Sequence, residues 1–158
     1  MRLASTRNPV NNPLRILGLL LGLFLLIQLV PYGRAHANPA VQAEPQWDSP
    51  TTRALFDRAC ADCHSNRTKW PWYSNVAPVS WLVQNHVNEG RRNFNINTPG
   101  FGREADEAAN EVRKGKMPEP TYLPMHPEAR LSDAAHDQLI RGLQATFGGE
   151  GNQSGDGD

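Results

Sequence analysis

Apolar residues recur at helical spacing along most of the chain, and no segment alternates apolar and polar residues with the period of a β-strand. The predicted helices lie at about 49–63, 81–89, 105–114 and 132–147. Ser49 and Ser132 are typical N-cap residues for the first and last of these helices, with Asp48 as an alternative for the first. Gly90 and Gly115 are placed to end the second and third. A short helix that starts near residue 50 would hold a cysteine pair in its last turn.

Two segments between these helices are predicted as loops. Residues 93–102 are rich in asparagine and glycine, and residues 117–127 contain several prolines, which cannot continue a helix. The pattern as a whole therefore predicts an all-α domain of about four helices with long irregular loops.

A continuous apolar run at residues 14–30 precedes this domain. Only Arg15 and Gln28 interrupt it, the N-terminus before it is basic, and the small-x-small triplet at 35–37 follows it. This layout is typical of an export signal, although the run is also near the short limit for a membrane-spanning helix of about 20 residues. We expect either a hydrophobic helix retained as a membrane anchor or cleavage after Ala37. Both hypotheses place the domain on the periplasmic side of the bacterial inner membrane.

The chain divides into four parts by composition. Residues 38–50 are rich in proline and predicted as an extended linker, and the glycine- and aspartate-rich end is predicted to be disordered. The expected organisation is 1–37 signal peptide or anchor, 38–50 linker, 51–147 folded domain and 148–158 tail.

Charge is balanced over the 158 residues, with sixteen basic and sixteen acidic side chains. A nucleic-acid partner would require a basic stripe, which the sequence lacks. We therefore expect no nucleic acid among the partners, although aromatic residues cluster at 70–73.

Both cysteines lie in the sequence CADCH, as Cys60 and Cys63 directly before His64. A structural zinc site would need further ligands, and the chain has no second cysteine pair. A thiol–disulfide redox motif usually opens a helix after a strand, whereas this pair closes a helix. Covalent haem attachment needs two thiols for the vinyl groups and an imidazole for the iron. The motif predicts one haem c on Cys60 and Cys63, with His64 as the proximal ligand and its second ring nitrogen bonded to a backbone carbonyl. A thiol redox protein is the less favoured alternative.

The residues by themselves do not identify the second axial ligand of the haem iron. Met117 lies between a helix stop and a proline, and Met125 lies just before the last helix. His86, His126 and His136 are the other candidates, although His86 on an apolar helix face is more typical of a core histidine.

Aromatic side chains near the cysteine motif are candidates for the haem pocket. Flat rings cover a flat apolar cofactor efficiently, and Trp70, Trp72, Tyr73 and Trp81 are the predicted wall. Arg91 is a candidate partner for a haem propionate.

Two long segments of the sequence resemble a known family. These are CADCHSNRTKWPWYSNVAPVSWLVQNHVNEGR and GKMPEPTYLPMHPEARLS, and they resemble the haem-binding domain family of exported bacterial proteins over about residues 31–143. The family's Gly-x-Met-Pro segment is matched by Gly115, Met117 and Pro118, so the resemblance implies Met117 rather than Met125 as the distal ligand. Met125 or His126 is kept as the alternative. The segment 95–100 departs from the family pattern.

These observations predict an exported monohaem c-type cytochrome with a small cytochrome c-like helical domain. We expect it to transfer electrons between redox partner proteins that the sequence does not identify, and not to be an enzyme. The alternative is a haem-based sensor or small haem enzyme with an open distal position.

Overall fold

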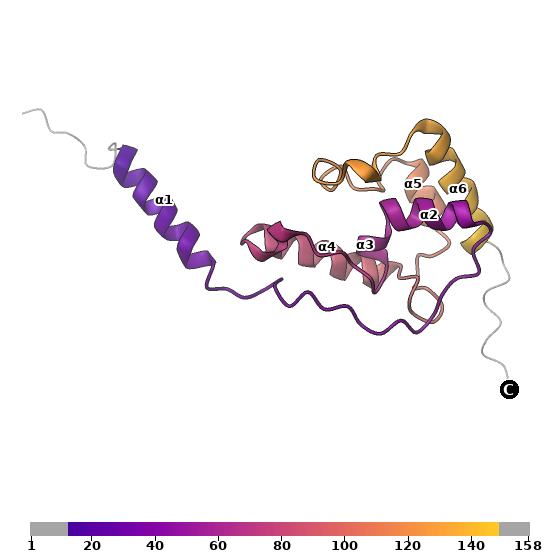
Figure 1. Ribbon diagram of the computed structural model, residues 1–158, viewed down its shortest axis with the longest axis horizontal. Helices are drawn as coiled ribbons and strands as arrows, with labels where there is room; N and C mark the ends of the chain where they lie inside the picture. Colours follow the sequence, from indigo (N-terminus) through magenta and orange to yellow (C-terminus); the bar gives the residue numbers. More distant parts are fainter. Residues whose placement is uncertain (1–12, 149–158) are drawn as a thin grey trace, which may run out of the picture. The chain divides into compact units, whose positions relative to one another are not determined.

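The computed structural model describes residues 13–148, and every regular element in that range is helical (Figure 1). The α-helices are α1 Pro13–Ile27, α2 Pro50–Ala59, α3 Ala61–His64, α4 Val79–Asn93, α5 Ala108–Arg113 and α6 Asp133–Phe147. Two short 3₁₀ helices are η2 Trp72–Asn75 and η3 Pro127–Ala129. The prediction of an all-α protein is confirmed for the described residues. The predicted disordered tail lies outside them, apart from Gly148.

The chain folds as two units. The first contains Met1–Ala35 and Pro71–Gln84, and the second contains His36–Trp70 and Asn85–Asp158. Helix α1 and η2 belong to the first unit, whereas α2, α3, α5 and α6 belong to the second. Helix α4 contributes its first residues to the first unit and the rest to the second.

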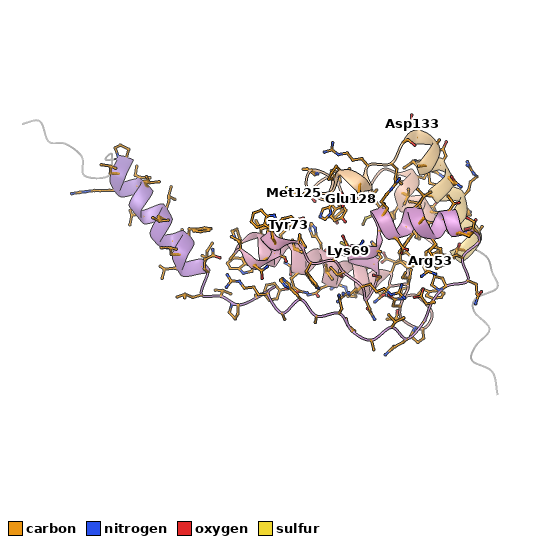
Figure 2. All side chains as sticks on the ribbon, viewed as in Figure 1. Arg53, Lys69, Tyr73, Met125, Glu128 and Asp133 are labelled. Atoms are coloured by element: carbon orange, nitrogen blue, oxygen red, sulfur yellow. The ribbon has the colours of Figure 1, made fainter. Side chains whose placement is uncertain are left out.

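Apart from Arg15, helix α1 is apolar, and its side chains are exposed around its circumference (Figure 2). Among residues 13–148, no helix is both long and apolar enough to cross a membrane. The turn that follows α1 is bonded to the residue pair before α4 and to the first turn of α4. Gln28 Nε2 donates to the Ala77 carbonyl (2.9 Å), the Ala77 N–H donates back to Gln28 Oε1 (3.0 Å), and Ser80 Oγ donates to the Tyr32 carbonyl (3.3 Å).

The core of the second unit is formed by α2, α5, α6 and the loop after α4. Its buried members are Leu55, Phe56, Phe94, Ile96, Ala109, Val112, Leu139, Ile140, Leu143 and Phe147. Helices α2 and α6 approach closely because residue 142 is glycine: a Cβ there would lie 2.0 Å from Thr52 Oγ1. Ser49 and Ser132 are the N-caps, each accepting a backbone N–H with its hydroxyl, as the sequence predicts.

Helix boundaries near the cysteines differ from the prediction. Helix α2 ends at Ala59, and Cys60 separates it from the single turn α3, so the expected helix is split. Gly90 does not end α4, which continues to Asn93. The reason for glycine at this position is packing, since a Cβ on Gly90 would lie 2.5 Å from the carbonyl oxygen of Cys63. Helix α4 therefore lies directly against the backbone of the cysteine motif.

Residues 38–49, which precede α2, form no helix but are packed against the rest of the second unit. The Gln42 and Ala43 N–H groups donate to the Asn97 carbonyl at 3.0 and 3.3 Å. The ring of Trp47 packs 5.2 Å from that of Phe56 and 5.7 Å from that of Phe147. This segment is therefore part of the folded body rather than a free linker.

Candidate functional site

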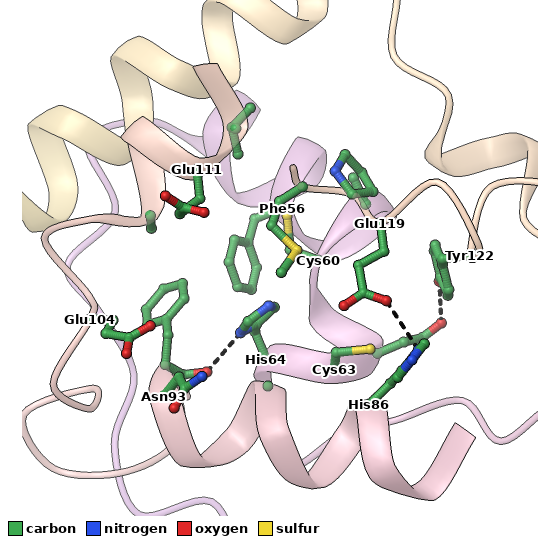
Figure 3. Close-up of a pocket in the computed structure, with 18 of the residues that line it drawn as sticks. Phe56, Cys60, Cys63, His64, His86, Asn93, Glu104, Glu111, Glu119 and Tyr122 are labelled. Atoms are coloured by element: carbon green, nitrogen blue, oxygen red, sulfur yellow. Dashed lines mark hydrogen bonds and ion pairs between the residues drawn. The ribbon is translucent and has the colours of Figure 1, made fainter. Parts of the chain in front are cut away.

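A cavity of about 290 Å³ lies within the second unit (Figure 3). Its walls come from α2, α3, α4, α5, α6 and the loops at 94–107 and 117–122. The apolar part of the lining includes Phe56, Phe94, Val112 and Leu143. The acidic part consists of Asp62, Glu89, Glu104, Glu107, Glu111 and Glu119, and none of the described lining residues is a lysine or arginine. The cavity is therefore partly apolar and, at neutral pH, negatively charged.

Cys60 and Cys63 both line this cavity as free thiols. Cys60 occupies the break between α2 and α3, and its carbonyl accepts the N–H groups of Cys63 (3.2 Å) and His64 (3.0 Å). This turn brings the two thiols and the imidazole to the same cavity. Burial raises the pKa of each thiol to about 12, with a smaller contribution from neighbouring negative charge. Both groups are therefore protonated at neutral pH.

His64 lines the cavity and is held by the loop after α4. Its Nδ1 lies 2.9 Å from the carbonyl oxygen of Phe94, and the two rings are 5.4 Å apart. A carbonyl only accepts, so the proton must be on Nδ1 and Nε2 is left with a free lone pair. Burial lowers the pKa of His64, which favours this neutral form. The neutral imidazole thus presents Nε2 as the donor atom that the predicted ligand role requires, and the carbonyl partner expected from the sequence is that of Phe94.

The two candidate methionines have different surroundings. Met117 is partly buried and lines the same cavity as Cys60, Cys63 and His64. Met125 is 55% exposed and lies outside the cavity lining (Figure 2). The structure therefore brings Met117, and not Met125, to the cysteine motif.

The histidine candidates are engaged in other contacts. His86 lines the cavity, with Nδ1 3.1 Å from Glu119 Oε2. His126 lies outside the lining, where it stacks on Tyr122 at 3.8 Å and places Nδ1 3.0 Å from Glu128 Oε1. His136 donates from Nε2 to a backbone carbonyl of α5 at 3.1 Å.

An interaction that sequence reasoning missed joins the loop at 117–122 to the cysteine motif. The Tyr122 hydroxyl donates to Asp62 Oδ2 at 2.7 Å (Figure 3). Burial and the neighbouring carboxylate raise the pKa of Tyr122. Asp62 lies between the two cysteines in the sequence, so this bond links the loop at 117–122, which carries Met117, to the cysteine motif. No local pattern in the sequence identifies such a pair.

The aromatic residues expected around the cofactor are not among those that line the cavity. Trp72, Tyr73 and Trp81 belong to the first unit, and the ring of Trp70 stacks on His36 at 4.8 Å. The side chain of Trp72 is 74% exposed.

Arg91 is also absent from the cavity lining. Its guanidinium donates to the carbonyls of Ser65 and Ala37, both at 2.9 Å. It also donates to Asn38 Oδ1 (2.8 Å) and Thr68 Oγ1 (2.9 Å). These bonds join α4 to two neighbouring segments, so in this structure Arg91 is a structural cross-link.

A cavity lined by two thiols, an imidazole with a free Nε2 and a thioether has the donor set of a haem-binding protein. A family model described as haem-binding domain matches residues 22–145. Because this match covers most of the 158 residues, the chain belongs to the haem-binding domain family. The resemblance seen in the sequence is thereby confirmed. No curated protein and no solved structure shows a significant match to the chain.

Proposed function

We propose that this protein is an exported monohaem c-type cytochrome that transfers electrons. Cys60 and Cys63 would hold the haem through thioether bonds, with His64 and Met117 as the axial ligands. The observation that carries the proposal is the cavity lined by all four side chains, in which the Phe94 carbonyl fixes the tautomer of His64. Haem bound in this way supplies a one-electron ferric–ferrous couple.

The residues of this chain would contribute orientation and exclusion of water. Phe94 fixes the imidazole with its carbonyl and covers it with its ring. Phe56, Val112 and Leu143 supply apolar surface from three helices. A rigid, dry environment keeps the reorganisation that accompanies electron transfer small. The carboxylates around the cavity favour the more positively charged ferric state, and a thioether ligand opposes them by favouring the ferrous state.

The test is the ferric absorption spectrum of the wild-type protein beside Met117→Ala and Met125→Ala. Sulfur bound to ferric haem gives a weak far-red band, and we expect Met117→Ala alone to lose it. Haem-stained gels of the denatured proteins should show covalent haem in all three. A band that survives in Met117→Ala would contradict the axial assignment, and wild-type protein without covalent haem would contradict the whole proposal.

The alternative, a haem sensor or small haem enzyme with an open distal position, is supported by one contact. His86 and Glu119 line the cavity together, with Nδ1 and Oε2 3.1 Å apart. A histidine oriented by a carboxylate is a typical proton-transfer group. Under this alternative the wild-type spectrum would lack the far-red band, and the ferrous protein would bind carbon monoxide without displacing a ligand.

We propose that the domain lies on the periplasmic side of the inner membrane, where it meets other redox proteins, and that the apolar run at 14–30 associates it with the membrane without the described helix α1 being long enough to span it. Two observations favour a retained leader over cleavage after Ala37. Gln28 and Tyr32 are bonded to Ala77 and Ser80 within the first unit, and the family match begins at residue 22. Protein from cell membranes should therefore have the mass of the uncleaved chain. A soluble periplasmic form that starts at Asn38 would contradict retention.

A further inference from the structure

Three buried asparagines close a ring of hydrogen bonds beside His64. The Asn66 N–H donates to Asn97 Oδ1 (3.0 Å), and the Asn97 N–H donates to Asn95 Oδ1 (2.9 Å). Asn95 Nδ2 completes the ring by donating to Asn66 Oδ1 (2.8 Å). Asn66 is 5% exposed, Asn95 is 3% exposed and Asn97 is 0% exposed. We refer to these three residues as the asparagine ring.

The asparagine ring joins the segment that carries His64 to the segment that carries its hydrogen-bond acceptor. Asn66 follows His64 by two residues, and Asn95 follows Phe94 directly. Between the same segments, His64 Nδ1 donates to the Phe94 carbonyl (2.9 Å), and the Ile96 N–H donates to the His64 carbonyl (3.0 Å). The position of the Phe94 carbonyl relative to the imidazole is therefore set by this group of bonds.

Every side-chain oxygen and nitrogen of the asparagine ring has a hydrogen-bond partner, so the ring cannot rearrange without breaking bonds. Asn66 Nδ2 donates to the Ala40 carbonyl (2.9 Å), and Asn97 Nδ2 donates to the Ala43 carbonyl (3.1 Å). With the ring bonds, each side-chain oxygen and nitrogen of the three asparagines has a partner. Removing one amide leaves buried partners unpaired, which is costly, so the segments must then shift or admit water.

We propose that Asn95 is a positioning residue for His64, because it holds the Phe94 carbonyl against the Nδ1–H group. This inference rests on the proposed function, since it takes His64 as the iron ligand. A hydrogen bond from Nδ1–H makes an imidazole a more basic ligand, and a more basic ligand favours the ferric state. Loosening this bond shifts the reduction potential in the positive direction.

The experiment compares the wild-type haem-loaded protein with Asn95→Ala and Asn95→Asp. The aspartate variant keeps the side-chain volume and the oxygen that accepts the Asn97 N–H. When its carboxyl group is ionised, it cannot donate to Asn66 Oδ1. We expect Asn95→Ala to have a more positive reduction potential than the wild type. The added negative charge of Asn95→Asp favours the ferric state and opposes this shift, so that variant is judged by proton exchange alone. In the reduced proteins, NMR should show solvent exchange of the His64 Nδ1 proton accelerated by about tenfold or more, because the bond opens more often.

Ile140→Ala is the matched control. Ile140 is buried in α6 but does not line the cavity, so its truncation lowers stability without reaching His64. An unchanged potential in Asn95→Ala, or an unchanged exchange rate in the Asn95 variants, would overturn the inference, and so would an equal shift in Ile140→Ala. If Asn95→Ala does not accumulate, Asn95→Asp still gives the exchange rate. The covalent haem of the wild type is checked first. If it is absent, the proposed function is wrong, and the inference about Asn95 fails together with it.

Discussion

The two sides of the cavity are held in different ways. On the His64 side, a backbone carbonyl and the asparagine ring fix the imidazole, and Gly90 lets α4 lie against Cys63. On the Met117 side, Met117 packs against the core, but the rest of the loop at 117–122 is joined to the cavity wall by pairs of ionisable side chains, Tyr122 on Asp62 and Glu119 on His86. Backbone packing tolerates little change, whereas side-chain pairs near solvent contribute little stability. We therefore expect substitutions on the His64 side to have the larger effects.

The largest contrast is expected in haem attachment. Cys60→Ser and Cys63→Ser remove a thiol from the His64 side, and the double variant should lose all covalently bound haem because no thioether can form. Met117→Ala on the other side should keep its covalent haem. Haem-stained gels of the denatured proteins measure this directly. Equal loss of haem in Met117→Ala and the double cysteine variant would show that the two sides do not differ in this respect.

The reactivity of the thiols in the chain without haem offers a second test of the His64 side. Burial raises the pKa of Cys60 from an ordinary 9.0 to about 12. At pH 8 the thiolate fraction, and hence alkylation by iodoacetamide, should be about a thousandfold below that of the urea-unfolded chain. The raised pKa stabilises the folded chain below pH 9, and this contribution is lost as pH rises from 9 towards about 12. Equal alkylation rates in the folded and unfolded chains would contradict this account of burial.

Two glycine substitutions compare the rigidity of the two sides. Gly90→Ala places a Cβ 2.5 Å from the Cys63 carbonyl oxygen, and we expect a loss of about 2–3 kcal/mol in the free energy of unfolding. Gly115→Ala on the Met117 side meets no atom within 4 Å, but its φ of +68° should cost about 1 kcal/mol. Urea denaturation measures both. A larger loss for Gly115→Ala would reverse the comparison.

The smallest effect is expected for Tyr122→Phe, which removes the bond to Asp62 Oδ2 and little else. The free energy of unfolding should fall by about 1 kcal/mol, because Asp62 is left near solvent rather than in the core. The far-red band of the ferric protein should persist. Loss of that band would show that this hydrogen bond, and not only the fold of the loop, holds Met117 in place.

Features that depend on neighbouring residues were predicted well from the sequence. The caps at Ser49 and Ser132 and the final helix depend on contacts within one or two turns, which leave a periodic pattern. The helix end at Gly90 was predicted wrongly because that prediction also relied on local preference alone. Glycine ends helices by local backbone preference, but here it serves a contact with a distant carbonyl that no local pattern records.

The sequence by itself determined the helical class, the family resemblance and the His64 motif, because two thiols and an imidazole within five residues form a local pattern. The tertiary structure alone decided which distant groups join them. It brought Met117 rather than Met125 to the cavity, selected the Phe94 carbonyl for His64, and connected Arg91 to backbone carbonyls. The physical reason is that such contacts depend on how whole helices pack, and the spacing of residues along the chain does not encode that packing.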